Sequence, residues 1–117
     1  MPQYTLLLHE STTEFADLSP DEMQRIITKY QDWSRKVAEA GRLVGGHKLR
    51  DGSGRVMTGA NGKPVVRDGP YIEGKEVIGG YFIITADHYD HAVKIASDCP
   101  HLAYGGTIEV REIEKVD

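Results

Sequence analysis

The chain has 117 residues, of which 39% are hydrophobic and 27% are charged, and its formal net charge is −4. This length and composition predict one globular domain, residues 1–117, with a core of its own. An acidic balance without a basic block gives no indication of a phosphate-backbone partner, so direct nucleic-acid binding is not expected. The opening MPQYTLLLHEST lacks the basic segment and the long apolar run of a signal peptide or membrane span. We therefore expect a cytoplasmic protein that does not enter a membrane.

The helix signals along the chain are unequal in strength. After a first strand at 3–9, the combination of Ser19, Pro20 and Glu22 predicts a capping box with proline at the first helical position. The helix predicted from about 20 to 40 carries a stripe at helical spacing: Met23, Ile26, Ile27, Tyr30, Trp33 and Val37. We expect core packing for Trp33. A short second helix is predicted within 87–100, with Asp87 as its N-cap and Pro100 just past its end.

The remaining segments favour strands. Asn61-Gly62 is a preferred centre for a tight turn, so residues 54–68 are predicted to form a β-hairpin. The other predicted strands are 42–51, 76–86 and 105–113. The order strand, helix, strand, hairpin, strand, helix, strand predicts a ferredoxin-like α+β fold, βαββαβ with an inserted β-hairpin.

The strand at 76–86 is apolar on both of its faces, which indicates that both are covered. The two predicted helices cover one face of the sheet. A second copy of the sheet is the simplest cover for the other face, so we expect a homodimer.

Residues 68–84, DGPYIEGKEVIGGYFII, resemble the DGPF signature of the YCII-related family, with Tyr71 at the aromatic position. The segments AGRLVGG at 40–46, CPH at 99–101 and GGTIEVRE at 105–112 are also similar to that family. The resemblance spans nearly the whole chain. It implies a dimeric α+β barrel, in agreement with the strand pattern.

The resemblance implies less about activity. A recurring histidine and aspartate in the family suggest an enzyme, and related dimeric barrels include small monooxygenases, lyases and isomerases acting on compact aromatic or lactone substrates. Other members stand beside or are fused to sigma-factor-like proteins, which suggests a regulatory role. This chain departs from the family pattern, because the position of the histidine on the first helix, eleven residues before Gly41, is occupied by Tyr30.

Two residues are the candidate catalytic pair. His101 suits proton transfer at neutral pH, or else it is a polar residue near a helix end. Asp68 would orient His101, or else it is a turn residue of Asp-Gly-Pro. Both interpretations of each residue stay open on the sequence alone.

Four residues are candidates for binding a substrate. His47 follows Gly45-Gly46, where a ligand could approach the backbone, or else it is an exposed strand residue. Arg67 could pair with an anionic group or with a neighbouring glutamate. Tyr30 and Tyr81 could pack in the core and still present a phenol to a ligand.

For the other residues with reactive or metal-binding side chains we expect structural roles. Cys99 has no partner for a disulfide and is expected to act as a small hydrophobe. His88 and His91 are three residues apart, but acids at a helix start explain the aspartates between them, so no metal site is expected. No cofactor is expected.

The sequence therefore predicts a pocket for a compact metabolite in each subunit. If the protein is an enzyme, we expect cofactor-free proton transfer of the isomerase or lyase type by His101 and Asp68. The alternative is a non-enzymatic ligand-binding or transcription-associated module with a sigma-factor-type partner.

Overall fold

A computed structural model of the chain describes residues 1–11, 18–70 and 76–116. Its elements in chain order are β1 (Gln3–Ser11), α1 (Pro20–Glu39), β2 (Leu43–Lys48), β3 (Arg55–Ala60), β4 (Lys63–Asp68), β5 (Glu76–Thr85), α2 (Tyr89–Ala96), α3 (Pro100–Ala103) and β6 (Thr107–Glu112). Among these residues, no helix is both long enough and apolar enough to cross a membrane.

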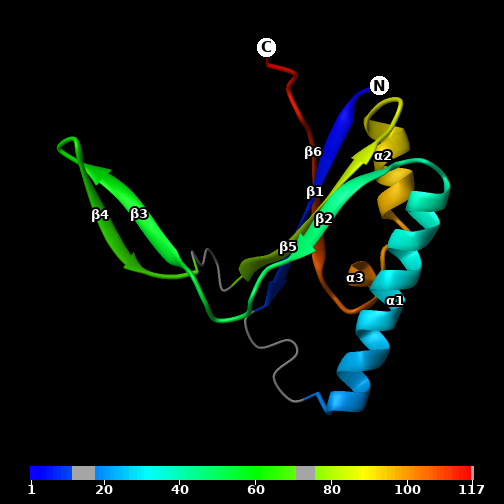
Figure 1. Cartoon of the computed structure of the whole chain (residues 1–117), viewed down its shortest axis with the longest axis horizontal. Helices are drawn as coiled ribbons and strands as arrows, with labels where there is room; N and C mark the ends of the chain where they lie inside the picture. The colour runs from blue at the N-terminus through cyan, green and yellow to red at the C-terminus, as the bar shows by residue number, and fades with distance from the viewer. Residues whose placement is uncertain (12–17, 71–75, 117) are drawn as a thin grey trace.

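The main sheet has the strand order β2-β5-β1-β6, and every neighbouring pair is antiparallel. All three helices lie on one face of this sheet (Figure 1). This topology confirms the ferredoxin-like α+β fold, with β3 and β4 as the insertion between the second and third strands of the main sheet.

The sequence signals at both ends of α1 form the expected contacts. The Glu22 backbone N–H donates to Ser19 Oγ at 3.1 Å, and the Ser19 N–H donates back to the Glu22 carboxylate at 3.4 Å. Gly41 follows the helix with a φ of 75°, the left-handed conformation that ends many helices. The predicted capping box and helix end are therefore confirmed.

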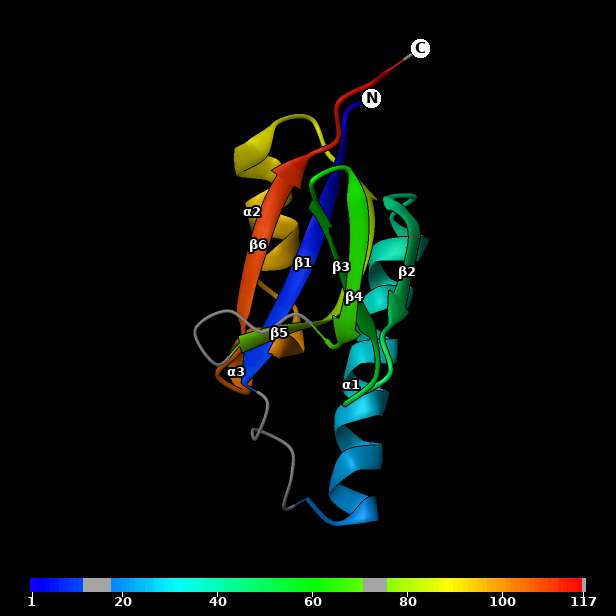
Figure 2. The same ribbon diagram turned by 90° about the vertical axis from the view of Figure 1, so that its left-hand side faces the viewer.

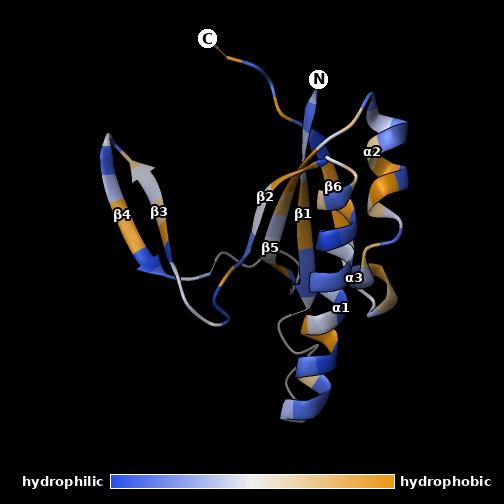
Figure 3. Cartoon of the chain, turned by 45° about the vertical axis from the view of Figure 1, so that its right-hand side comes forward, coloured by the Kyte–Doolittle hydropathy of each residue, from blue (hydrophilic) through white to orange (hydrophobic). Residues whose placement is uncertain are grey.

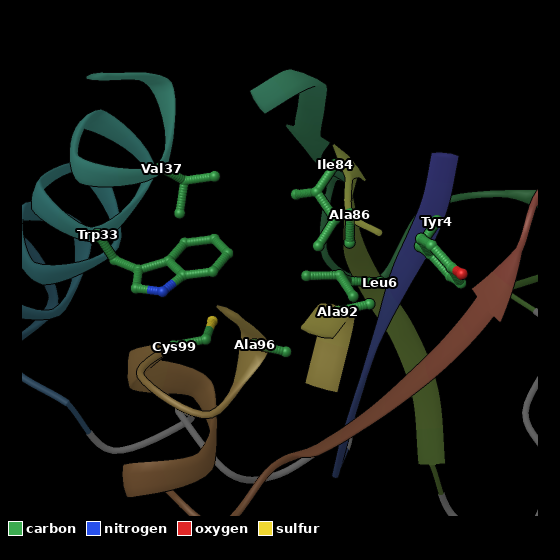
Figure 4. Close-up of a cluster of buried hydrophobic side chains, with 9 residues drawn as sticks. All are labelled: Tyr4, Leu6, Trp33, Val37, Ile84, Ala86, Ala92, Ala96 and Cys99. Atoms are coloured by element: carbon green, nitrogen blue, oxygen red, sulfur yellow. The ribbon is translucent and has the colours of Figure 1, made fainter. Parts of the chain in front are cut away.

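The core lies between the sheet and the helices, and Figure 4 shows its side chains converging from both layers. It consists of Tyr4, Leu6, Trp33, Val37, Ile84, Ala86, Ala92, Ala96 and Cys99. Trp33 is 5% exposed and meets Phe82 edge to face, with ring centroids 5.0 Å apart. Burial raises the pKa of the Cys99 thiol, as expected of a small hydrophobe.

The predicted second helix forms as α2, and a further short helix, which was not predicted, follows it. The side chain of His88, not of Asp87, caps α2 by accepting from the His91 backbone N–H. Pro100 begins a further helix, α3, where the sequence suggested only a stop. A proline just past one helix is also suited to the first position of the next, because its missing N–H would have no helical partner there.

The sheet face turned away from the helices is named here the open face. Strand alternation places Leu7, Tyr81 and Ile83 on it, since their neighbours Leu6 and Phe82 pack toward the helices. All three open-face side chains are half-buried within the single chain. The single chain therefore carries apolar side chains on a face that no helix covers.

The hairpin of β3 and β4, residues 55–68, is named here the arm. Its Asn61 and Gly62 have φ values of 53° and 77°, which confirms the predicted tight turn. The arm forms its own two-stranded sheet and projects from the side of the main sheet opposite the helices (Figures 1 and 2). The radius of gyration is 16.0 Å, against about 13 Å for a compact domain of this length.

Candidate functional site

A cavity of about 460 Å³ lies between α1 and the helix-facing side of the main sheet. Its apolar wall includes Met23, Ile26 and Ile27 from α1, and Leu8 and Phe82 from the sheet. Its polar lining includes Glu10, Tyr30, Lys48, Asp51 and His101. The volume and the mixture of an apolar wall with a few polar groups are typical of a small-molecule site.

Glycines in β5 leave space beside the sheet at this cavity. The pairing of β5 with β1 shifts by one residue at Gly79, where Leu8 is opposite Gly80 and His9 is opposite Ile78. A Cβ at Gly79 would overlap the carboxylate of Glu10, and one at Gly80 would lie 3.0 Å from the His47 carbonyl oxygen. The two glycines therefore let the Glu10 side chain and β2 approach the strand closely.

His101 is held by hydrogen bonds at both ring nitrogens. Its side chain is 1% exposed; Nε2 lies 2.7 Å from the backbone oxygen of His9, and Nδ1 lies 2.9 Å from Tyr30 Oη. A carbonyl oxygen only accepts hydrogen bonds, so we assign the proton of the neutral ring to Nε2. Nδ1 then accepts a hydrogen bond from the Tyr30 hydroxyl.

This assignment gives the Tyr30–His101 pair two states. With neutral His101, the phenol donates to Nδ1 and its oxygen offers lone pairs to other groups. With protonated His101, Nδ1–H donates to the phenol oxygen, whose own O–H is released to donate elsewhere. Both residues line the cavity. The pair therefore presents a phenol hydrogen-bonded to a buried imidazole at the wall of the cavity.

A missing side chain at Gly106 leaves the space that the His101 ring occupies. A Cβ at this position would overlap the imidazole ring and lie 2.6 Å from Cε1. The Gly106 N–H also donates to the His101 carbonyl at 3.0 Å. The absence of a side chain at Gly106 is therefore what lets the His101 ring pack against the backbone at this position.

We expect Gly106→Ala to destabilise the fold by about 1–3 kcal/mol, because the added methyl group must displace the His101 ring from the His9 carbonyl. Urea unfolding followed by circular dichroism measures this loss. Gly59→Ala is the matched control, since a Cβ there has no atom within 4 Å. A Gly106→Ala variant as stable as Gly59→Ala would contradict this account of the packing around His101.

The structure does not bring Asp68 and His101 together in one chain. Asp68 ends β4 on the arm, its side chain is 92% exposed, and its carboxylate lies 3.5 Å from Arg55 Nη1. The ring nitrogens of His101 bond to Tyr30 and to the His9 carbonyl instead. Within the single chain, a backbone carbonyl does the orienting that the sequence interpretation gave to Asp68.

The predicted binding residues are divided between the two faces of the sheet. Tyr30 lines the cavity. Tyr81 is on the open face, where its ring meets that of His47 at a centroid distance of 5.8 Å. His47 borders the cavity while its ring stays with Tyr81, and Arg67 lies on the exposed arm. Of the four residues, only Tyr30 presents its side chain together with His101.

The sequence interpretation missed the polar cavity residues Glu10, Lys48 and Asp51, together with Gln31 and Ser34 of α1. Glu10 continues the alternation of Leu6 and Leu8, which was the available signal that its side chain turns to the helix side. Lys48 Nζ and Asp51 lie 3.0 Å apart at the end of β2. Among residues 1–11, 18–70 and 76–116, no cluster of three His, Cys, Asp or Glu side chains is arranged to hold a metal ion.

Comparison with known proteins places the chain in a family. The chain is 27% identical over 112 residues to an uncharacterized protein of Rhizobium meliloti (strain 1021), and the match covers 94% of this chain and 90% of that protein. The sequence profile of the YCII-related domain matches residues 3–117. Because that match covers nearly the whole sequence, the chain belongs to the YCII-related domain family.

Proposed function

We propose that the chain binds a compact organic metabolite in the cavity between α1 and the sheet, and moves a proton on it without a cofactor. The observation that carries this proposal is the Tyr30–His101 hydrogen bond of 2.9 Å at the cavity wall, backed by the 2.7 Å bond from His101 to the His9 carbonyl. A phenol coupled to an oriented imidazole is suited to general acid–base work near neutral pH.

The proton balance of the proposed step is simple. Tyr30 Oη takes a proton from the ligand as its own hydroxyl proton passes to His101 Nδ1. The pair, directly or after exchanging its proton with solvent, then delivers a proton from Tyr30 to a second position on the ligand as His101 Nδ1 returns its proton to the phenol oxygen. The net change is therefore an isomerisation. The apolar wall excludes water from the anionic intermediate, which favours a carbonyl compound that delocalises the charge as an enolate.

Deuterium exchange tests the proposal before any substrate is known. Small ketones, β-keto acids and enol lactones are incubated with the protein in D₂O, and loss of their acidic C–H signals is followed by NMR. We expect at least one compound to exchange faster with the protein than without it. If compounds bind in the cavity but exchange no faster with the protein than without it, the proposed enzymatic proton transfer is contradicted. That result would support the alternative, a ligand-binding or transcription-associated module.

We further propose that the protein is a homodimer through the open face. The half-buried Leu7, Tyr81 and Ile83 supply the apolar side chains there, and a second copy presents the same group in return. Sheets that pack face to face bury such side chains in a layer about 10 Å thick. This interface is on the side of the sheet opposite the cavity.

Sedimentation velocity tests the homodimer. We expect the wild-type chain to sediment with twice the 13.0 kDa mass of one chain, and Leu7→Glu to shift it to the single-chain mass. Val93→Glu is the control, because Val93 is an exposed residue of α2, one of the helices on the side of the sheet opposite the open face. A wild-type chain that stays monomeric at high micromolar concentration would contradict the proposal.

A further inference from the structure

We propose that the arm is a clasp that packs against a second copy of this chain. The proposal rests on the homodimer of the preceding subsection and adds a second contact to it. Among the described residues, strands β3 and β4 of the arm pair with each other, in a sheet separate from the main one. The exposed apolar side chains of the arm, Met57, Val65 and Val66, are left uncovered by the described part of its own chain.

Exposed apolar side chains lie on both faces of the arm, with Val65 on one and Met57 and Val66 on the other. Met57 is opposite Val66 across the two strands, so both project from the same face, and Gly59 is opposite Pro64 beside them. Met57 is 64% exposed and Val66 is 55% exposed. Figure 3 shows a hydrophobic stretch along β4. An isolated two-stranded hairpin is marginally stable in water, so covering the face of Met57 and Val66 would also hold the arm together.

The position of the arm indicates the second copy as its occupant. The arm projects from the same side of the main sheet as the open face (Figures 1 and 2). A copy packed on the open face would therefore lie beside the arm. In a two-fold symmetric dimer each arm meets the other copy in the same way, so the contact occurs twice.

Charge complementarity also favours a second copy. The arm contains Arg55, Lys63 and Arg67 against a single acid, Asp68, a net charge of +2. The rest of the chain holds 11 of the 14 basic residues and 17 of the 18 acidic residues, a net charge of −6. Each arm is therefore attracted to the body of another copy, and this attraction weakens as salt screens it.

The double variant Met57→Glu/Val66→Glu tests the clasp. Both side chains are already exposed in one chain, so we expect the secondary structure of the variant by circular dichroism to match wild type. We expect its dimer dissociation constant, from sedimentation over a concentration series, to rise at least tenfold. Val93→Glu places one such charge on an apolar side chain that is 52% exposed on α2, and it should leave the constant unchanged.

Removal of the arm is the second variant. The Gly69 N–H donates to the Gly54 carbonyl at 3.0 Å, so the two ends of the arm are adjacent and residues 55–68 can be replaced by a two-residue turn. We expect this chain to fold and to lose dimer affinity at least as much as the double variant. Retention of wild-type affinity by both variants would overturn the clasp.

A photo-crosslinking residue in place of Met57 identifies what the arm contacts. We expect a covalent product of twice the chain mass, and none when the same residue replaces Val93. Crosslinks only within one chain would overturn the clasp. If the wild-type protein is monomeric at every concentration, both the homodimer and the clasp are wrong. If the wild-type protein dimerises and the arm variants dimerise as tightly, only the clasp is wrong.

Discussion

Tyr30→Phe is expected to slow deuterium exchange of a bound carbonyl compound by about 10²–10⁴-fold, the range in which positioned acid–base groups act. The phenol oxygen is the atom 2.9 Å from His101 Nδ1, and without it the buried imidazole has no path for a proton to the ligand. The measurement is the rate of loss of the ligand C–H signal in D₂O. The substitution removes only one oxygen atom, so the cavity keeps its shape.

Two further variants make this result specific. Tyr81→Phe is the same substitution on the open face and should change the exchange rate less than twofold, because Tyr81 does not line the cavity. His101→Gln keeps a donor for the His9 carbonyl but cannot take up the proton, so we expect a loss similar to that of Tyr30→Phe. A folded Tyr30→Phe protein that exchanges at the wild-type rate would contradict the proposed relay.

Trp33→Ala is expected to lower the free energy of unfolding by about 3–5 kcal/mol, since it removes a large buried side chain and leaves a cavity. Trp33 is 5% exposed and joins α1 to the sheet through its edge-to-face contact with Phe82. A loss of this size is a large part of the stability of a small domain, which is about 5–15 kcal/mol.

The loss is measured by urea unfolding followed by far-ultraviolet circular dichroism, because Trp33 is the single tryptophan and its fluorescence disappears with it. Trp33→Phe is the comparison, since it keeps a ring against Phe82 and should lose less than half as much. A loss below about 1 kcal/mol for Trp33→Ala would mean that α1 is held to the sheet elsewhere.

Local signals in the sequence predicted the fold well. The capping box at Ser19 and the Asn61-Gly62 turn depend on contacts within a few residues, and both occur as expected. The short helix α3 was missed because Pro100 suits a helix start as well as a helix stop, and only packing decides between the two. The capping role of His88 was missed because aspartate, the residue type of the neighbouring Asp87, is a more common N-cap than histidine.

The candidate site was predicted only in part, because its contacts join distant segments. Tyr30 and His101 were both singled out, but nothing local indicates that residues 71 positions apart share a hydrogen bond. The pairing of Asp68 with His101 assumed that the Asp-Gly-Pro segment turns toward the helices, whereas Asp68 ends a hairpin that projects from the other side. Tyr81 could have been assigned to the open face by strand alternation, once Phe82 was placed against Trp33.

The bond from His101 to the His9 carbonyl has a practical consequence for spectroscopy. An imidazole proton in a side chain that is 1% exposed, and held at a nitrogen–oxygen distance of 2.7 Å, is shielded from exchange with water. It should therefore give its own resonance in a proton NMR spectrum, far from the crowded amide region. Since the same ring contacts Tyr30 at the cavity wall, this single signal would report the arrival of any ligand, whether or not the ligand is ever converted.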